Sequence, residues 1–237
     1  MLILAFETSA KSCSVALHSG DKLLGESYQN TGLTHSQTLM VMAQDLLKVC
    51  GKTASDVTHL AVAAGPGSFT GVRIGVAAAK GFAWGGELPV YGVSTLDAMA
   101  RQMALDCFYI CACMDARRNQ VYNAIFSTVG GEWRVTEDRA ISIEELKADL
   151  LKLRGTTILV GDGAELVYRT LGAEVGTLIL APEQCRHQRA SGVALAALDM
   201  IRSGDPGDGA SLQPNYLRLS QAERERLEKQ NKGVSST

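Results

Sequence analysis

A glycine-rich segment between a predicted buried strand and a predicted helix restricts the fold of this chain more than any other feature. It reads Ala64-Gly65-Pro66-Gly67-Ser68-Phe69-Thr70-Gly71-Val72-Arg73-Ile74-Gly75, and three more glycines follow before Pro89. Each glycine inside a helix costs roughly 0.5 to 1 kcal/mol relative to alanine. Some interaction must therefore offset the cost of these glycines.

Two kinds of interaction could offset the cost of the glycines, and they indicate different functions. Gly65 and Gly67 would let the backbone approach an anion and direct free N–H groups at it, as phosphate-binding turns do. Gly71, Gly75 and Ala79 recur every four residues, so they share one flat helix face suited to close packing. The segment matches neither GxxxxGK[ST] nor GxGxxG. The local pattern alone favours helix packing over phosphate contact.

The overall composition limits the classes of protein to which the chain can belong. With 237 residues, 46% of them hydrophobic, it can form one large domain or two small ones. No apolar run approaches the roughly 20 residues that cross a bilayer, and the N-terminus lacks a basic signal region. We therefore expect a cytoplasmic protein without membrane contact. The net charge of -2 gives no general electrostatic footprint for a polyanion.

The hydrophobic periodicity predicts two successive α/β units. In the first, we expect strands at 2–8, 12–18, 23–28, 57–64 and 89–93, with helices at 34–50, 68–85 and 96–103. In the second, we expect strands at 107–114, 121–127, 132–136, 157–160 and 178–180, a helix at 143–153 and a last core helix at 191–203. Because both units begin with a meander, we predict an internal duplication.

Several motifs occur in a familiar order along almost the whole chain. They are Glu7-Thr8-Ser9, the 64–75 segment, Gly92-Val93-Ser94-Thr95-Leu96, Asp115-Ala116-Arg117-Arg118 with Val121-Tyr122, Val160-Gly161-Asp162-Gly163 and Pro214-Asn215-Tyr216-Leu217-Arg218. With this set the chain resembles the TsaB (YeaZ) family. The glycine motif is shared with the related catalytic subunit TsaD, so by itself it marks only the superfamily.

The resemblance implies an α/β fold of the actin-like ATPase (ASKHA) type. Two ribonuclease-H-like lobes, each a mixed sheet flanked by helices, would span residues 1–103, completed by the helix near 191–203, and residues 104–190. A C-terminal extension would cover residues 204–232, and residues 233–237 would form a disordered tail.

The resemblance also implies a function. TsaD transfers a threonylcarbamoyl group to the N6 of an adenosine beside the anticodon of tRNA, and the family supports TsaD as a non-catalytic scaffold. The implied partners are TsaD in a heterodimer, TsaE in a ternary complex, a second copy when TsaD is absent, and tRNA through the complex only. The alternatives are a stand-alone ASKHA-type ATPase or a glycoprotease-like peptidase.

Catalytic equipment is not expected in this chain. TsaD carries a His-x-Glu-x-His metal motif after the Gly-Val dipeptide, where this chain has Thr95, Asp97 and Met99. A hydroxyl, a carboxylate and a thioether are a poor combination for the same metal. His35 precedes Ser36 at a predicted helix start, and we interpret it as a capping or surface residue because no GxSxG elbow accompanies it. We expect no catalytic residue and no metal site.

Two sets of candidate site residues follow from the motifs and their resemblance. For the partner interface, the flat glycine face and the preceding helix supply His35, Leu39, Met40, Leu47, Gly71, Val72, Gly75 and Ala79. Candidate nucleotide contacts are Glu7, Thr8, Ser9, Gly65 and Gly67. The chain would have no cofactor of its own, and ATP or ADP would bind at the boundary with the partner.

For the remaining polar motifs, two interpretations stay open. Glu7 would either accept N–H bonds from the turn that follows it or contact a nucleotide. Asp115-Ala116-Arg117-Arg118 would form an intramolecular ion pair or meet TsaD, nucleotide or tRNA. The thiols of Cys107, Cys111 and Cys113 are predicted on one strand face, as buried reduced thiols rather than zinc ligands, because their spacing lacks the CxxC pattern.

Overall fold

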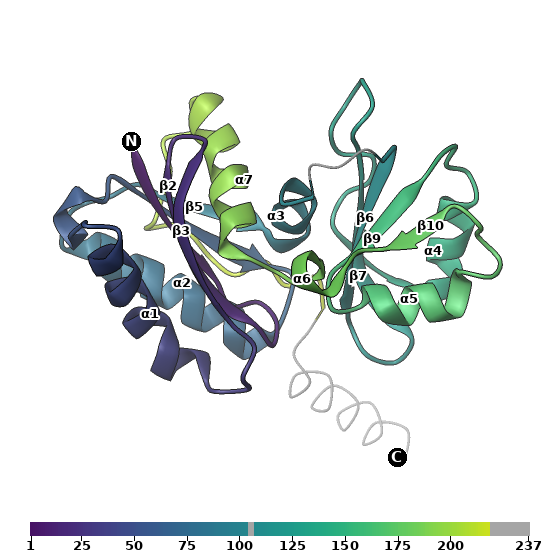
Figure 1. Cartoon of the computed structure of the whole chain (residues 1–237), viewed down its shortest axis with the longest axis horizontal. Helices are drawn as coiled ribbons and strands as arrows, with labels where there is room; N and C mark the ends of the chain where they lie inside the picture. Colours follow the sequence, from purple (N-terminus) through teal and green to yellow (C-terminus); the bar gives the residue numbers. More distant parts are fainter. Residues whose placement is uncertain (104–106, 219–237) are drawn as a thin grey trace, which may run out of the picture.

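Two lobes, each built on a five-stranded mixed sheet, make up the protein (Figure 1). The computed structural model describes residues 1–103 and 107–218. Most of the predicted C-terminal extension, from residue 219, and the predicted tail 233–237 lie outside the described residues. In the described ranges, no helix is both long and apolar enough to cross a membrane.

The first lobe begins with the predicted three-strand meander. Its elements are β1 (Leu2–Glu7), β2 (Cys13–Ser19), β3 (Lys22–Gln29), α1 (His35–Val49), the short 3-10 helix η1 (Ala54–Asp56), β4 (His59–Gly65), α2 (Phe69–Trp84), β5 (Val90–Ser94) and α3 (Thr95–Arg101). The sheet order is β3-β2-β1-β4-β5, with β1 antiparallel to β2 and parallel to β4.

The second lobe repeats this arrangement. Its elements are β6 (Tyr109–Asp115), β7 (Gln120–Ser127), β8 (Arg139–Ser142), α4 (Ile143–Leu150), β9 (Thr157–Val160), α5 (Ala164–Leu171), β10 (Leu178–Leu180), α6 (Glu183–Arg186) and α7 (Ala190–Arg202). The order β8-β7-β6-β9-β10 is again third, second, first, fourth and fifth strand of the unit. This repeated α/β topology confirms the predicted fold class.

The helices cover both faces of the first sheet, and α3 lies between the sheets (Figure 1). On one face of the first sheet, α1 and α2 enclose a core that includes Phe6 and Leu60. The other face packs against α7, which returns from the end of the chain to lie on the first lobe. Leu96 of α3 packs with the inner face of the second sheet, whose outer face is covered by α4 and α5. Helix α3 is therefore shared by the two lobes.

Two details of the second lobe differ from the sequence prediction. The strand predicted at 132–136 is wrong: this stretch forms only an isolated bridge between Arg134 and Phe126, and β8 begins at Arg139. Cys107 precedes β6 and packs in a different core cluster from Cys111 and Cys113, so the predicted common face of three cysteines is also wrong. None of the six cysteines, which all lie in the described part of the chain, forms a disulfide.

The flat face of α2 packs inside the chain, which corrects the predicted partner interface. A Cβ on Gly71 would collide with the carbonyl oxygen of Thr8, and one on Gly75 would lie 2.5 Å from Thr8 Oγ1. Ala79 is fully buried. These small residues let α2 approach β1 closely, so their face is not free to meet a partner.

The buried stripe of α1 belongs to the same core. Leu39 is 1% exposed and Leu47 5%, and Val72 of α2 is 1% exposed. The apolar periodicity was correctly interpreted as helical, but the chain itself covers these side chains. In the predicted set only Met40, at 42%, is well exposed, and His35 is half-buried.

We predict opposite effects from adding one methyl group at two glycines of α2. Gly71→Ala places its Cβ against the Thr8 carbonyl, and such overpacking should lower the free energy of unfolding by about 1–3 kcal/mol. Gly81 is the matched control, because a Cβ there meets nothing within 4 Å, and Gly81→Ala should stabilise by roughly 0.5–1 kcal/mol. Urea unfolding measures both, and equal shifts for the two variants would contradict the packing described.

Candidate functional site in the cleft between the lobes

A cavity of about 690 Å³ lies between the lobes, at the carboxyl ends of β1, β6 and β9. Equivalent hairpin turns of the two lobes form two of its walls. The first-lobe wall is residues 9–12, with Asn30 and Gly67, Ser68 and Phe69; the second-lobe wall is residues 114–117, with Tyr122, Asp162, Glu183, His187 and Gln188. The duplicated topology therefore brings two turns far apart in sequence to one cleft.

Only some of the predicted nucleotide contacts line the cleft. Ser9 and Gly67 line the cleft, whereas Glu7, Thr8 and Gly65 do not. Thr8 instead donates its hydroxyl to the carbonyl oxygen of Gly71 at 2.7 Å. The proposed set is thus only partly brought together at the cavity.

The space beside the glycines of the turn is occupied by other residues of the chain. Gly65 has a φ of +117°, and a Cβ there would collide with the carbonyl oxygen of Asn215, whose N–H donates to Ala64 at 2.6 Å. A Cβ on Gly67 would lie 2.5 Å from the carbonyl oxygen of Ser9. The close approach that these two glycines permit is intramolecular, which favours the packing interpretation, and a contact of Gly67 with a nucleotide stays a prediction.

Glu7 ends β1 as a fully buried carboxyl group. Its Oε1 accepts the N–H of Ser9 at 2.5 Å, the type of turn contact predicted for a structural role, and its Oε2 has no partner in the described part of the chain. Burial raises the pKa of Glu7 from 4.5 to about 7; the hydrogen bond from the Ser9 N–H opposes this rise, and the charge of Asp162 adds to it. Glu7 is therefore only partly ionised near neutral pH.

Polar atoms without partners remain at the wall of the cleft. Ser9 Oγ and Gln188 Oε1 are buried and make no hydrogen bond with any described residue. The amide of Gln188 donates to Asp162 Oδ1 at 2.9 Å, and burial raises the pKa of Asp162. Because buried polar atoms are normally satisfied, the cleft has free capacity to bind a polar ligand or water.

The positions that carry metal ligands in the TsaD pattern have other roles here. Met99 is 1% exposed, packs in the core between α3 and the second sheet, and lies close to Gly161. Thr95 is fully buried at the start of α3. Asp97 accepts the indole N–H of Trp133 at 2.6 Å and the Nε of Arg101 at 3.2 Å. These three side chains thus join the lobes.

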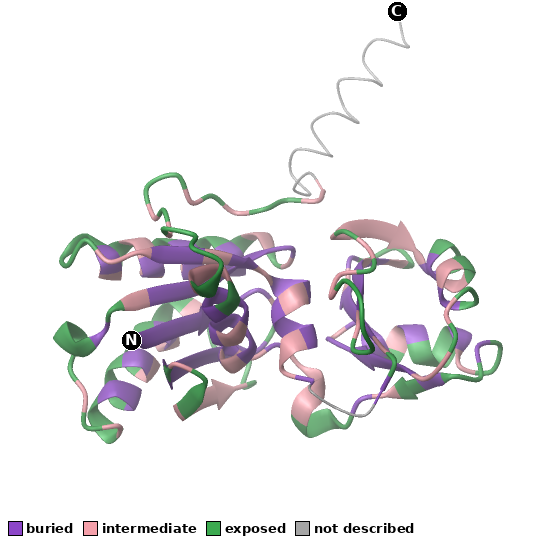
Figure 2. Cartoon of the chain, turned by 90° about the horizontal axis from the view of Figure 1, so that it is seen from above, coloured by how far each residue is buried: buried purple, intermediate pink, exposed green. Residues whose placement is uncertain are grey.

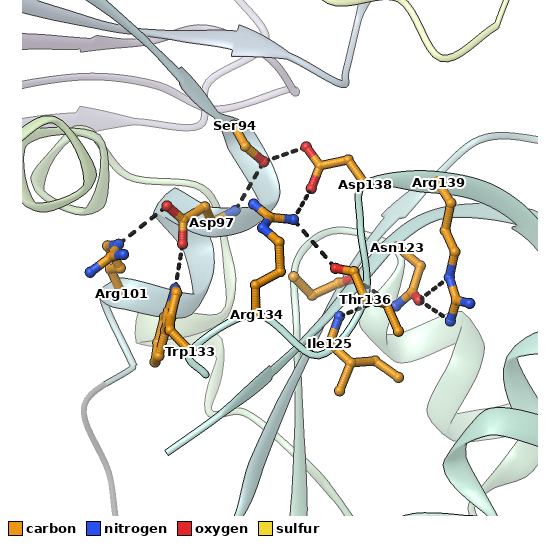
Figure 3. A network of polar contacts seen from close by, with 11 residues as sticks. Ser94, Asp97, Arg101, Asn123, Ile125, Trp133, Arg134, Thr136, Asp138 and Arg139 are labelled. Carbon is orange, nitrogen blue, oxygen red and sulfur yellow. Dashed lines mark hydrogen bonds and ion pairs between the residues drawn. The ribbon is translucent and has the colours of Figure 1, made fainter. Parts of the chain in front are cut away.

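A polar network extends this junction between the lobes (Figure 3). Ser94, at the end of β5, donates to Asp138 Oδ2 at 2.5 Å, and Arg134 donates to Asp138 Oδ1 at 2.6 Å. The ring of Trp133 lies 4.9 Å from the Arg101 guanidinium. The sequence predicted a strand here, and only these long-range partners show why residues 133–138 leave the sheet and turn toward α3.

Two further candidates have local partners. His35 Nε2 donates to the carbonyl oxygen of Ala10 at 2.8 Å and thereby fixes the start of α1 against the first hairpin turn. Asp115 accepts the N–H of Arg117 at 2.7 Å and forms an ion pair with its guanidinium at 3.8 Å. The intramolecular ion pair predicted for this motif is therefore present, although the Arg117 side chain is 83% exposed.

The C-terminal segment, residues 203–218, runs along the first lobe and reaches the second. Lys80 donates to the carbonyl oxygens of Ala210 and Leu212. The ring of Tyr216 stacks on Phe69 with centroids 4.5 Å apart, and Arg218 donates to the carbonyl oxygen of Ala116 at 2.6 Å. Sequence reasoning identified 214–218 only as a motif, and its contacts place it beside the cleft.

Two lobes of the same topology that enclose a cleft give the chain an α/β fold of the actin-like ATPase (ASKHA) type. The fold is shared with the activator of the 2-hydroxyisocaproyl-CoA dehydratase from Clostridium difficile, a structure with bound ADPNP, at a TM-score of 0.51 and 11% identity over 86% of this chain and 96% of that one. A protein from Pseudomonas aeruginosa described as similar to the peptidase YeaZ matches more closely, with a TM-score of 0.76 and 26% identity over 92% and 99%.

The sequence comparisons define the family. The profile of the family TsaD, tRNA N6-adenosine threonylcarbamoyltransferase, matches residues 29–224. The tRNA threonylcarbamoyladenosine biosynthesis protein TsaB of Escherichia coli K12 is 35% identical over 222 residues, which are 92% of this chain and 95% of that protein. The chain belongs to this family, in its TsaB branch.

We predict that Glu7→Gln stabilises the protein in a pH-dependent manner. The pKa of Glu7 is raised on folding, so its contribution to stability is fully present below pH 4.5 and is lost as the pH rises through about 7. A shift of this size corresponds to roughly 3 kcal/mol as an upper figure. The variant should therefore unfold at higher urea concentration than the parent at pH 8 but not at pH 4.5.

The exposed Glu132 provides the control, because Glu132→Gln removes the same charge at the surface. Groups such as His18, whose pKa is lowered mainly by burial, titrate in parent and variant alike and cancel in the difference. A Glu7→Gln gain that is equal at pH 4.5 and pH 8 would show that Glu7 is ionised in the folded protein.

Proposed function

We propose that this chain is the non-catalytic scaffold subunit that binds TsaD and supports its transfer of threonylcarbamoyl to the N6 of an adenosine beside the tRNA anticodon. One observation carries the proposal: the chain retains the two-lobed fold while Thr95 and Met99, at the positions of the TsaD histidines, are buried between the lobes. The protein is therefore an accessory subunit rather than a second transferase.

The names of the relatives support the pathway. The E. coli and Bacillus subtilis relatives are both tRNA threonylcarbamoyladenosine biosynthesis proteins, the latter 30% identical over 97% of this chain. We assign this chain to the same biosynthesis, in the cytoplasm, where it would meet tRNA through the complex with TsaD. TsaE would join as the third subunit, and a homodimer would form when TsaD is absent.

The docking face we propose differs from the one predicted from sequence. The buried faces of α1 and α2 belong to the core, so the partner must meet the opposite sides of these helices. Large apolar side chains are exposed there: Met40 at 42%, Val41 at 56% and Trp84 at 90%. An exposed tryptophan and methionine are the residue types enriched in the centre of interfaces.

A nucleotide fits this proposal at the boundary with the partner. Glu7 is buried and outside the lining of the cleft, and the glycine turn is occupied by Ser9 and Asn215. These residues are poorly placed to hold a triphosphate without help from a second chain. We propose that ATP or ADP is shared with TsaD, with Ser9 and Gly67 as the contacts from this chain.

Reconstitution of threonylcarbamoyl transfer tests the function. With TsaD, TsaE, threonylcarbamoyl-adenylate, ATP and unmodified tRNA, we expect modification only when this chain is present, and none from this chain alone. Full activity of TsaD without this chain would refute the scaffold role. Magnesium-dependent ATP hydrolysis by the isolated chain, abolished by Glu7→Ala, would instead favour the stand-alone ATPase.

The docking face has its own test with matched variants. Met40→Glu and Trp84→Glu should each weaken co-elution with TsaD by at least tenfold in apparent affinity, because they place a charge in an apolar contact. Leu151→Glu is the control, since Leu151 is 58% exposed on the second lobe, away from α1 and α2. Unchanged binding by both interface variants would exclude this face.

A further inference from the structure

The mouth of the cleft carries positive charges that the proposed scaffold role does not use. Lys11 lies on the first hairpin turn and Arg118 on the equivalent turn of the second lobe, and both are exposed. Arg73 follows Phe69 by one turn of α2, and Arg218 contacts the second turn through the carbonyl oxygen of Ala116. Lys11 itself lines the cleft, and the other three cations lie next to residues that line it: Arg73 over Phe69, Arg218 at Ala116 and Arg118 after Arg117 in the chain.

The charges of these four residues are not neutralised within residues 1–103 and 107–218. Arg73 donates to the hydroxyl of Tyr216, and Arg218 to a backbone carbonyl, both uncharged acceptors. None of the four forms an ion pair with a described residue. The nearby carboxylates have their own partners: Asp115 with Arg117, Glu183 with Arg186 and His187, and Asp162 with Gln188.

An aromatic surface lies beside these cations. Tyr216 stacks on Phe69 at 4.5 Å and 26°, while the Arg73 guanidinium lies 3.8 Å from the centre of the Phe69 ring and bonds the Tyr216 hydroxyl at 2.7 Å. Tyr216 is nevertheless 39% exposed. A tyrosine held rigidly by a ring and a guanidinium presents a surface on which a nucleobase can stack.

The second hairpin turn has an unusual backbone. Arg117, Arg118 and Asn119 all have positive φ, between +56° and +65°, although none is glycine. Residues with side chains rarely adopt this conformation, and strained segments of this kind concentrate at functional sites. The turn keeps both arginines exposed at the cleft.

We propose that this rim, formed by Lys11, Arg73, Arg118, Tyr216 and Arg218, binds an unpaired segment of RNA through its phosphates and one stacked base. Cations separated along the rim suit successive phosphates of a chain better than one compact mononucleotide. The net charge of -2 excludes a basic protein surface overall, but local clusters suffice for a subunit that shares RNA with its partner. This inference rests on the proposed function and identifies where this subunit would touch the tRNA.

RNA affinity of paired variants tests the rim. The probe is a 17-nucleotide anticodon stem-loop of unmodified tRNA, measured by fluorescence anisotropy with the full chain alone at 50 mM salt and with its TsaD complex at 150 mM. Lys11→Ala with Arg118→Ala should weaken binding about tenfold and reduce the salt slope by about 1.4, since each single-strand phosphate contact contributes about 0.7.

A charge-matched control removes two cations at the opposite end of the sheets. Lys22 begins β3 and Arg154 precedes β9, both exposed and distant from the carboxyl ends that form the cleft. Lys22→Ala with Arg154→Ala should leave affinity and slope within twofold of the parent. If both pairs weaken binding equally, the RNA responds only to total charge and the rim is refuted.

Two variants of Tyr216 distinguish the contribution of base stacking to RNA binding from that of charge. Tyr216→Ala should weaken binding roughly tenfold, whereas Tyr216→Phe keeps the ring and should stay within twofold of the parent. Circular dichroism and thermal unfolding confirm that the variants are folded. Equal losses for the alanine and phenylalanine variants would assign the effect to the Arg73 hydrogen bond and overturn the stacking surface.

The remaining outcomes also decide the proposal. AMP competing with the stem-loop at equal concentration would identify a mononucleotide site and overturn the proposal of an RNA segment. Binding of TsaD, followed by co-elution in the same preparations, distinguishes the two proposals. If the rim variants bind RNA as the parent does and TsaD binding is intact, only the rim is refuted. If TsaD does not bind, the proposed function is refuted, and RNA binding by the isolated chain still tests the rim.

Discussion

The contact between α2 and the turn after β1 is the constraint on which the rest of the structure depends. Gly71 and Gly75 allow α2 to approach Thr8, and the Thr8 hydroxyl in turn binds the Gly71 carbonyl at 2.7 Å. The same approach brings Ser68 N–H to the Ser9 carbonyl at 2.6 Å. The turn is thereby held in one conformation, Glu7 is buried beneath it, and the first wall of the cleft is fixed.

Helix α3 has the corresponding role between the lobes. It packs on α7 of the first lobe and on the inner face of the second sheet, and Asp97 adds hydrogen bonds to Trp133 and Arg101. In a family whose catalytic branch has metal ligands at these positions, this chain uses the same helix to join its lobes (Figure 2). At these positions Thr95 and Met99 are buried.

Sequence patterns predicted most elements because each depends on local periodicity. The meander of β1 to β3, helix α2, and strands β9 and β10 were found within a residue or two. The strand predicted at 132–136 was wrong because Trp133 binds Asp97 of α3, and the adjoining Asp138 binds Ser94, partners that no local pattern reveals. The Gly71 and Gly75 face was assigned to a partner because a flat face has the same spacing whether it packs inside a chain or between chains.

The sequence by itself determined the α/β class, the duplicated order of elements, the family and the loss of the histidine ligands, because these follow from residue types and their spacing. Only the tertiary structure decided which surface covers each apolar face. It showed that Ser9 and Asn215 pack against the glycine-rich turn, and that Tyr216 and Arg218 reach the cleft. The physical reason is that burial and close approach are pairwise properties, and many of the pairs join residues far apart in sequence, such as Gly65 and Asn215, which are 150 positions apart.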